Sequence, residues 1–425
     1  MKFLKEKIFS IIVFLISILL FFFIFYKSHI VWDGNRFNIY FQYYIFFFFL
    51  ILISILSFFL KKDTNYKYHL VLVSILISIY TIEILLIAFS YYDRIIDFEK
   101  KPKYQIYEEV KSKENISIVF NHKSYFDKNS SQYFLGGKSK IKNLYCNENG
   151  YYSFFYSDRF GFRNNDDLWN ENLIDIILVG DSFGLNACVN KDHTIVENVI
   201  KKDGKLKIIN LSWDGNGPLS NYASLIEYAN DKNFKKLIWF YFPNDFENLN
   251  QEKKNRILKK YIDNDFFSQN LKTKQIKINS SIDKLIKKSH ENFLRERQNK
   301  KHKSNIINFL KLQKLRSKVS YSGKIQYDLN LLKKIFQKTK NYTDRNDIEL
   351  TVIYLPDFYE VKNNKDSQKK LILFSILDEL NIKHLDFFEY VKKVKNPLSI
   401  FPFEKLGHYN ESGYKLLAEF IYVNL

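Results

Sequence analysis

Residues 1–92 differ in composition from the rest of this 425-residue chain, because most of them are apolar. A helix needs roughly 20 apolar residues to cross a bilayer. Three stretches approach that length, at residues 8–26, 40–60 and 70–91. No small-residue cleavage site follows the first stretch, so we expect a retained helix there rather than a signal peptide. The sequence therefore predicts three transmembrane helices, followed by a part with the composition of a soluble domain.

Lysine placement predicts the orientation of these helices. The loop between the first two stretches holds only Lys27 and Arg36, whereas other lysines flank the opposite ends: Lys2, Lys5, Lys7, Lys61, Lys62 and Lys67. Cytoplasmic loops carry the excess of Lys and Arg. We therefore expect the N-terminus in the cytoplasm and, after three crossings, the remainder of the chain outside it.

Glu83 lies inside the third apolar stretch. An ionisable group within a membrane span is costly and often functional. The alternatives are a hydrogen bond between helices or a position close to the membrane surface.

The formal charge of +19 is compatible with a solvated, lysine-rich surface or with attraction to anionic lipid headgroups or an acidic polymer. No recognisable nucleic-acid motif accompanies the charge, and the membrane region argues against a nucleic-acid partner.

Short apolar runs alternate with helical patterns after residue 170. The expected strands are 175–179, 207–211, 237–242, 350–355 and 382–387. Buried parallel strands have this continuous apolar character. We therefore expect an α/β domain over 171–425, with three α/β/α layers and a parallel sheet of about five strands. A lysine-rich helical insertion is expected at 247–345, and an irregular wrapping segment at 93–170.

Candidate catalytic residues follow the ends of the expected strands. The first strand ends in Gly180-Asp181-Ser182, and ligands of open α/β sheets bind at that edge. Gly215 and Asn244 follow the next two strands and offer a backbone and a side-chain N–H. His408 immediately precedes the last helix. A serine nucleophile needs such a base and such donors.

Cys146 and Cys188 are the only cysteines. Outside the cytoplasm a pair tends to form a disulfide, which here would tie the segment before the first strand to the loop behind Ser182. The alternative is two buried, unpaired thiols. Two cysteines without companions at metal-ligand spacing do not indicate zinc.

Ser182, Gly215, Asn244 and His408 resemble the four sequence blocks of the SGNH/GDSL hydrolase superfamily. Three flanking segments resemble its bacterial subgroup with N-terminal membrane spans: Ser157–Asn164, Ala187–Val189 and Gly407–Tyr414. The resemblance implies that Ser182 is the nucleophile and that His408 is the general base. It also implies an oxyanion hole made by the Ser182 and Gly215 N–H groups and the Asn244 amide.

The sequence departs from the family pattern in two places. Phe242 stands where the family has Gly two residues before the Asn. The family acid lies two or three residues before the His, where this chain has Lys405 and Leu406. We expect Glu404 to be the acid. The alternatives are Asp386 and a Ser-His dyad supported by a backbone carbonyl.

The resemblance implies a serine esterase or O-acyltransferase in a bacterial inner membrane, with its catalytic domain outside the cytoplasm. The resemblance also implies acetyl groups of envelope glycans as substrates, and a partner membrane protein would supply acyl groups for a transferase. The chemistry requires no metal or organic cofactor. The alternative is a non-catalytic binding or structural module on a degenerate hydrolase fold.

Overall fold

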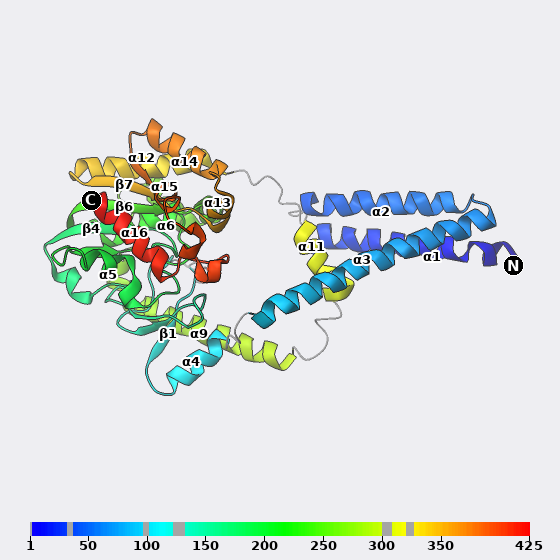
Figure 1. Ribbon diagram of the computed structural model, residues 1–425, viewed down its shortest axis with the longest axis horizontal. Coiled ribbons are helices and arrows are strands. Elements are labelled where there is room, and N and C mark those ends of the chain that lie inside the picture. The colour runs from blue at the N-terminus through cyan, green and yellow to red at the C-terminus, as the bar shows by residue number, and fades with distance from the viewer. Residues whose placement is uncertain (1, 32–36, 97–101, 122–131, 300–307, 320–326) are drawn as a thin grey trace. The chain divides into compact units, whose positions relative to one another are not determined.

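The structure, a computed structural model, describes residues 2–31, 37–96, 102–121, 132–299, 308–319 and 327–425 (Figure 1). The chain forms two compact units. One consists of Met1–Ile96 and His302–Tyr321, and we call it the helical unit. The other consists of Asp97–Lys301 and Ser322–Leu425, and we call it the sheet unit.

Among its described residues the helical unit includes three long helices and the short helix α11. They are α1 (Lys2–Phe25), continued by the π-helical turn Tyr26–Val31, α2 (Phe37–Ser57), α3 (Lys62–Ile96) and α11 (Gln313–Val319). The first three are long and apolar enough to cross a membrane, over Lys7–Val31, Tyr40–Ser57 and Lys62–Phe89. Most of their large apolar side chains are exposed, as expected of surfaces that face lipid. These spans agree with the three stretches expected from the sequence.

The sheet unit contains eight strands within the part of the chain that the structure describes. They are β1 (Ile116–Ile118), β2 (Lys142–Leu144), β3 (Phe154–Tyr156), β4 (Leu173–Val179), β5 (Ile208–Asn210), β6 (Asn233–Tyr241), β7 (Glu349–Tyr354) and β8 (Lys383–Asp386). Its helices are α4 (Lys103–Lys111), α5 (Ile195–Ile200), α6 (Pro218–Tyr228), α7 (Asp245–Glu252), α8 (Arg256–Asp263), α9 (Gln275–Asn299), α12 (Leu329–Arg345), α13 (Phe358–Asn363), α14 (Gln368–Glu379), α15 (Phe387–Val391) and α16 (Glu411–Val423).

Strands β4 to β8 form one parallel sheet in the order β5-β4-β6-β7-β8. In its register Ile177 pairs with Ile209 on one side and with Leu237 on the other. The five strands expected from the sequence are therefore confirmed, as is their parallel arrangement. Their carboxyl ends share one edge, and the loops that leave β4, β5 and β6 there carry Ser182, Gly215 and Asn244.

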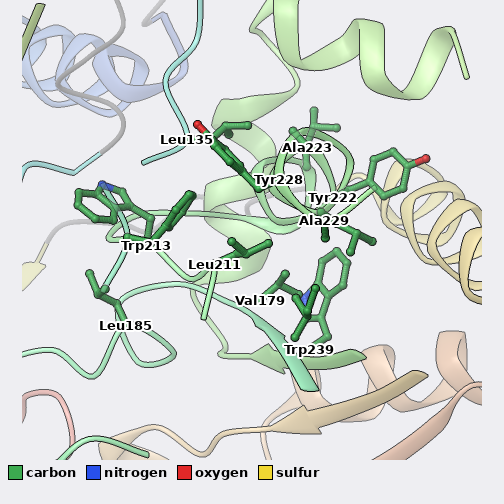
Figure 2. Close-up of a cluster of buried hydrophobic side chains, with 14 of the residues drawn as sticks. Leu135, Val179, Leu185, Leu211, Trp213, Tyr222, Ala223, Tyr228, Ala229 and Trp239 are labelled. Carbon is green, nitrogen blue, oxygen red and sulfur yellow. The ribbon is translucent and has the colours of Figure 1, made fainter. Parts of the chain in front are cut away.

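Alternating side chains of the sheet enter two separate cores. Ile177, Val179 and Trp239 pack on the face covered by α6, α8 and α12, whereas Leu178 and Ile238 pack on the face covered by α5, α15 and α16. Figure 2 shows Val179 and Trp239 in the first core. Successive residues of a strand point to opposite faces. This confirms the predicted three-layer α/β/α fold.

The segment expected to be irregular, 93–170, contains α4 and a small sheet in the order β1-β2-β3. Each of these strands has three residues, too few for a periodic pattern to reveal from the sequence. The connection from β2 to β3 bears on the site, since it carries Glu148.

Candidate active site

Ser182 stands in a tight turn directly after β4, where two glycines allow close packing. A Cβ on Gly180 would lie 3.0 Å from the Phe240 Cβ, and one on Gly184 would lie 2.4 Å from the Ser212 Oγ. Any larger side chain at Gly184 would therefore displace the neighbouring loop. The Asp181 carboxylate accepts a hydrogen bond from the Phe183 N–H at 2.9 Å, which closes the turn.

A continuous hydrogen-bonded chain links Ser182, His408 and Glu148. The Ser182 Oγ lies 2.8 Å from the His408 Nε2, and the His408 Nδ1 lies 3.0 Å from both carboxylate oxygens of Glu148. The His408 backbone N–H also donates to Glu148, at 2.6 Å. A carboxylate can only accept, so Nδ1 carries the proton and Nε2 accepts from the serine hydroxyl.

Glu148 was not among the residues expected from the sequence, and a disulfide brings it to the site. Cys146 and Cys188 are bonded, with their Cα atoms 4.9 Å apart. The Asn149 side chain donates to the Cys188 carbonyl at 2.9 Å. A Cβ on Gly407 would lie 2.8 Å from the Glu148 Oε2, so glycine is needed for the carboxylate to reach the imidazole.

The structure does not bring Glu404 to His408, which corrects the expectation from the sequence. The Glu404 carboxylate accepts a hydrogen bond from the Asn396 side chain at 2.7 Å. Phe403 and Glu404 both have positive φ values, of 52° and 54°. This bend directs the side chain of the exposed Glu404 toward Asn396 instead of along the loop toward His408.

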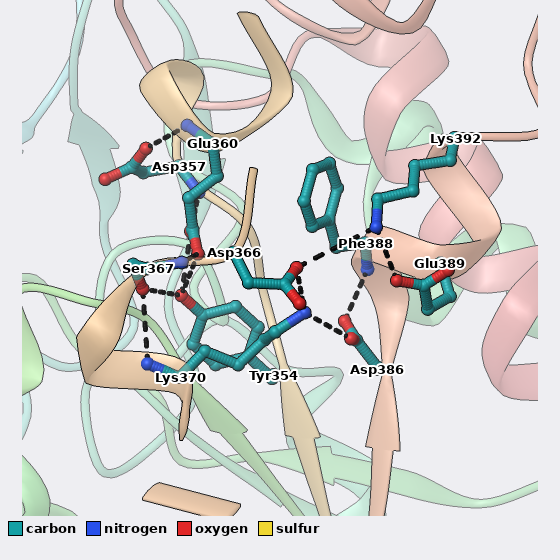
Figure 3. Close-up of polar contacts among 10 residues, drawn as sticks. All are labelled: Tyr354, Asp357, Glu360, Asp366, Ser367, Lys370, Asp386, Phe388, Glu389 and Lys392. Atoms are coloured by element: carbon teal, nitrogen blue, oxygen red, sulfur yellow. Dashed lines mark hydrogen bonds and ion pairs between the residues drawn. The ribbon is translucent and has the colours of Figure 1, made fainter. Parts of the chain in front are cut away.

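Asp386, the alternative acid, is also occupied elsewhere. Its carboxylate accepts from the Lys370 ammonium at 2.7 Å and from the Phe388 N–H at 2.9 Å, as Figure 3 shows. The Lys370 side chain is buried between Asp366 and Asp386. A hydrogen bond from the Tyr354 hydroxyl to the Glu360 carboxylate orders the neighbouring loop. Asp386 therefore stabilises the C-terminal end of β8.

Gly215 and Asn244 occupy the loops next to Ser182. Gly215 has φ of +79°, and a Cβ there would meet the Asn121 side chain at 2.0 Å, so only glycine fits. The Asn216 side-chain amide connects this turn to the turn that carries Ser182, because it donates a hydrogen bond to the Gly180 carbonyl at 3.3 Å. The expected oxyanion-hole positions thus share one sheet edge with Ser182.

The Asn244 side chain contacts a neighbouring amide. Its oxygen accepts a hydrogen bond from the Asn248 side-chain amide at 3.5 Å. Phe242, which stands where the family has Gly, stacks on Phe183 with ring centroids 3.8 Å apart. Phe183 in turn contacts the imidazole of His408, at 4.7 Å between centroids. The bulk of Phe242 therefore supports the His408 ring through Phe183.

Acidic groups surround His408. Exclusion of water from the imidazole opposes its positive charge. The hydrogen bond and charge of Glu148, with the charges of Asp214 and Asp181, outweigh that effect and raise the pKa of His408. Burial raises the pKa of Asp181 to about 6, and burial also raises the pKa of Asp245, on which the charge of Asp181 acts in the same direction. The site thus favours a positive charge on the imidazole.

The motif Ser157–Asn164 supports the loop behind Ser182. The Arg163 guanidinium donates to the Asn186 and Val189 carbonyls, at 3.0 Å each. Asp158 accepts from the Phe162 N–H and from the Asn164 amide, at 2.9 and 2.8 Å. These contacts give the motif a positioning role around Cys188 rather than a chemical one.

One group of possible metal ligands occurs among the described residues. The Cys188 sulfur and the ligand atoms of Glu148 and His408 lie within 4.8 Å of one another. Because the sulfur is bonded to Cys146, it provides no thiolate. The contacts from Ser182 through His408 to Glu148 therefore lie against a disulfide.

The observed parallel sheet agrees with the fold that the resemblance to the SGNH/GDSL superfamily implies. No family model matches the sequence, and no curated protein matches it. Similar solved structures include a lipase/acylhydrolase from Enterococcus faecalis, with 10% identity, 59% of this chain and 94% of that chain covered, and a TM-score of 0.35.

Two further similar structures are a putative lipolytic protein of the G-D-S-L family from Desulfitobacterium hafniense DCB-2 and an acetyl xylan esterase, AlAXEase. The first has 13% identity, 60% and 100% coverage and a TM-score of 0.30. The second has 12% identity, 59% and 100% coverage and a TM-score of 0.32. At such values the likeness carries no argument about chemistry, which rests on the side chains described above.

Loss of the Cys146–Cys188 disulfide is expected to slow the reaction of Ser182 with a fluorophosphonate probe. Glu148 lies two residues from Cys146, and a displacement of about 1 Å in such a site costs on the order of 100-fold. In the double variant Cys146→Ser/Cys188→Ser we expect labelling to be about 10- to 100-fold slower. Ser139→Ala, near the same small sheet, is the control. An unchanged rate in the double variant would show that the disulfide does not position Glu148.

Proposed function

We propose that this protein is a membrane-anchored serine esterase or O-acyltransferase that forms an acyl-enzyme on Ser182. The observation that carries the proposal is the unbroken chain of contacts from the Ser182 Oγ through His408 to Glu148. A nucleophile, a base within 2.8 Å and a carboxylate that orients the base are what acyl transfer by serine requires.

In the first half-reaction the Ser182 Oγ attacks the ester carbonyl carbon, and His408 Nε2 takes the hydroxyl proton. The resulting tetrahedral intermediate collapses, the bond to the leaving alcohol breaks, and the imidazolium protonates the departing oxygen. Glu148 keeps the proton on Nδ1 and stabilises the positive ring. The raised pKa of His408 matches this need, since the ring must hold a proton transiently.

The negative oxygen of the intermediate requires hydrogen-bond donors. The backbone N–H groups of Ser182 and Gly215 and the side-chain amide of Asn244 are the proposed donors. They come from loops after three adjacent strands, so the sheet edge holds their spacing. Preorganised donors of this kind are worth about 100- to 1000-fold each in turnover.

The second half-reaction decides between esterase and transferase. When His408 deprotonates water, attack on the acyl-enzyme releases a carboxylic acid and restores Ser182. When it deprotonates a sugar hydroxyl, the product is a new ester. On the basis of the family resemblance, the acyl groups that we propose are transferred or removed are acetyl groups of envelope glycans. In the transferase case a partner membrane protein would deliver the acyl group.

The proposed location is a bacterial inner membrane, with the sheet unit outside the cytoplasm. Three long apolar helices, an odd number, support opposite locations for the N-terminus and the sheet unit. The disulfide supports an oxidising compartment. The contact between His408 and Glu148 supports the enzymatic proposal over a non-catalytic module on a degenerate hydrolase fold.

The triad assignment predicts which carboxylate matters. Ser182→Ala should abolish labelling by a fluorophosphonate probe. Glu148→Gln should slow ester hydrolysis by about 100- to 10,000-fold, because the amide no longer enforces the required tautomer of the imidazole. Glu404→Gln is the matched control and should retain nearly full activity.

The measurement is turnover of p-nitrophenyl acetate by the full-length protein in detergent. A large loss in Glu404→Gln with little loss in Glu148→Gln would reverse the assignment. A folded protein that never labels at Ser182 would contradict the enzymatic proposal.

The pH profile is expected to have an acidic limb above the ordinary imidazole pKa of about 6.5. Activity requires neutral His408, so it rises with pH through the pKa and is lost as the pH falls below it. In Glu148→Gln one source of the raised pKa is removed, and the limb should move to lower pH. A limb that stays in place in this variant would contradict the proposed coupling.

An acceptor experiment separates the two activities. The full-length protein is incubated with p-nitrophenyl acetate, with and without an oligosaccharide acceptor. Release of acetate by water alone indicates an esterase, whereas mass spectrometry of an acetylated acceptor indicates a transferase. Ser182→Ala controls for uncatalysed transfer.

A further inference from the structure

The insertion between α9 and α12 contributes a segment, Asn308–Val319, to the helical unit. Its helix α11 packs against α3 (Figure 1). The two carboxylate oxygens of Glu83 accept hydrogen bonds from the Lys314 and Leu315 N–H groups, at 2.9 and 2.7 Å. These amides belong to the first turn of α11, where no intrahelical acceptor exists. Glu83 is buried, and its carboxylate holds the segment against α3.

Two tyrosines, Tyr80 of α3 and Tyr43 of α2, contact the rest of the segment. The Tyr80 hydroxyl donates to the Leu310 carbonyl at 3.0 Å, and the Tyr80 ring lies 5.1 Å from that of Phe309. The Arg316 guanidinium lies over the Tyr43 ring of α2, at 5.5 Å. The segment therefore contacts two of the three long helices.

Tyrosine contacts gather at one end of the bundle. Tyr44 makes a hydrogen bond with His29, in the π-helical turn that continues α1, and Tyr43 and Tyr80 contact the segment itself. Tyrosine is enriched at the level of the lipid headgroups. At the opposite end of the bundle, Ser10 of α1 contacts His69 of α3. Glu83 makes the hydrogen bond between helices that the sequence left as one alternative. Its place beside these tyrosines supports a level near the membrane surface, on the side toward which α3 leads.

The segment has the chemistry of a headgroup ligand. Between His302 and Tyr321 the chain has five Lys or Arg and no Asp or Glu. Lys311 and Arg316 are exposed, and their neighbour Leu310 is 59% exposed. Exposed apolar groups interleaved with cations suit a layer in which hydrocarbon and phosphate meet.

We propose that Asn308–Val319 is an interfacial element that lies among the headgroups of the outer leaflet and binds anionic lipid through Lys311, Lys314 and Arg316. Leu310 enters the apolar side of the interface, and Glu83 fixes the depth of the segment. This inference rests on the proposed membrane anchoring, and it adds a lipid-binding site that the esterase chemistry does not require.

The test measures depth with single cysteines. The native cysteines are bonded to each other, so a fluorophore labels an introduced cysteine selectively in the full-length protein reconstituted into vesicles. Leu310→Cys is compared with Leu76→Cys, within the α3 span, and with Leu371→Cys, on the sheet unit. Quenching lipids carry a nitroxide either near the glycerol or near the chain end. We expect Leu310 to be quenched by the shallow nitroxide, Leu76 by the deep one and Leu371 by neither.

A second arm tests the lipid charge. At equal mole fraction, shallow-nitroxide phosphatidylglycerol should quench Leu310 severalfold more than phosphatidylcholine, because each cation near an anionic surface changes partitioning by roughly fivefold. Lys311→Gln/Lys314→Gln/Arg316→Gln should bring the ratio close to one. The control removes three exposed lysines of α9, in Lys277→Gln/Lys284→Gln/Lys287→Gln, and should keep the preference.

The outcomes separate this inference from the proposed anchoring. Quenching at Leu76 with none at Leu310 would overturn the interfacial placement alone. Equal quenching of Leu310 by the two lipids would overturn the anionic-lipid site. Absence of quenching at Leu76 would overturn membrane anchoring and this inference with it, while Ser182 labelling would still report on the chemistry.

Discussion

The disulfide between Cys146 and Cys188 is the constraint on which the arrangement of the site depends. Glu148 belongs to a connection outside the parallel sheet, whereas Ser182 and His408 lie on loops at the sheet edge. Glu148 and His408 are 260 residues apart in the chain. Closing so large a separation costs conformational entropy, and a covalent link two residues from the carboxylate limits the remaining freedom. The proposed acid, Glu148, is therefore held in place by the neighbouring disulfide rather than by the parallel sheet.

The parallel sheet was predictable because its strands are buried on both faces and so appear as continuous apolar runs. The early part of β6 was missed, since Asn233, Lys235 and Lys236 lie at the polar margin of the sheet. Ser182 and His408 were found because each borders a strand end or a helix start. Glu148 could not be found that way, since no local pattern links it to His408. The expected disulfide was the feature of the sequence that pointed to Glu148, because it placed the residues around Cys146 beside the Ser182 loop.

Electrostatics explains why acidic residues gather at the site despite the chain's net charge of +19. Asp181 and Asp245 are buried, and one oxygen of each has no hydrogen-bond partner among the described residues. Such burial is costly and raises the pKa of both groups. The charge of Asp181, together with the charges of Glu148 and Asp214, favours a protonated imidazole and so supports the positive charge that forms on His408 during the reaction.

Buried glutamates recur in this chain as acceptors for the backbone of a distant loop. Glu252 accepts from the Gly217 and Leu219 N–H groups, which fixes the start of α6 just after the Gly215 turn. Glu227 accepts from the Leu271 N–H in the same manner, and Glu83 accepts from two N–H groups of α11. A carboxylate has several acceptor sites, so one side chain satisfies two or three loop amides and offsets its own burial. Glu148 uses the same device on the His408 backbone N–H while it orients the imidazole. The proposed catalytic acid thus performs a structural task that this chain assigns to glutamate elsewhere, with a histidine side chain added to the contact.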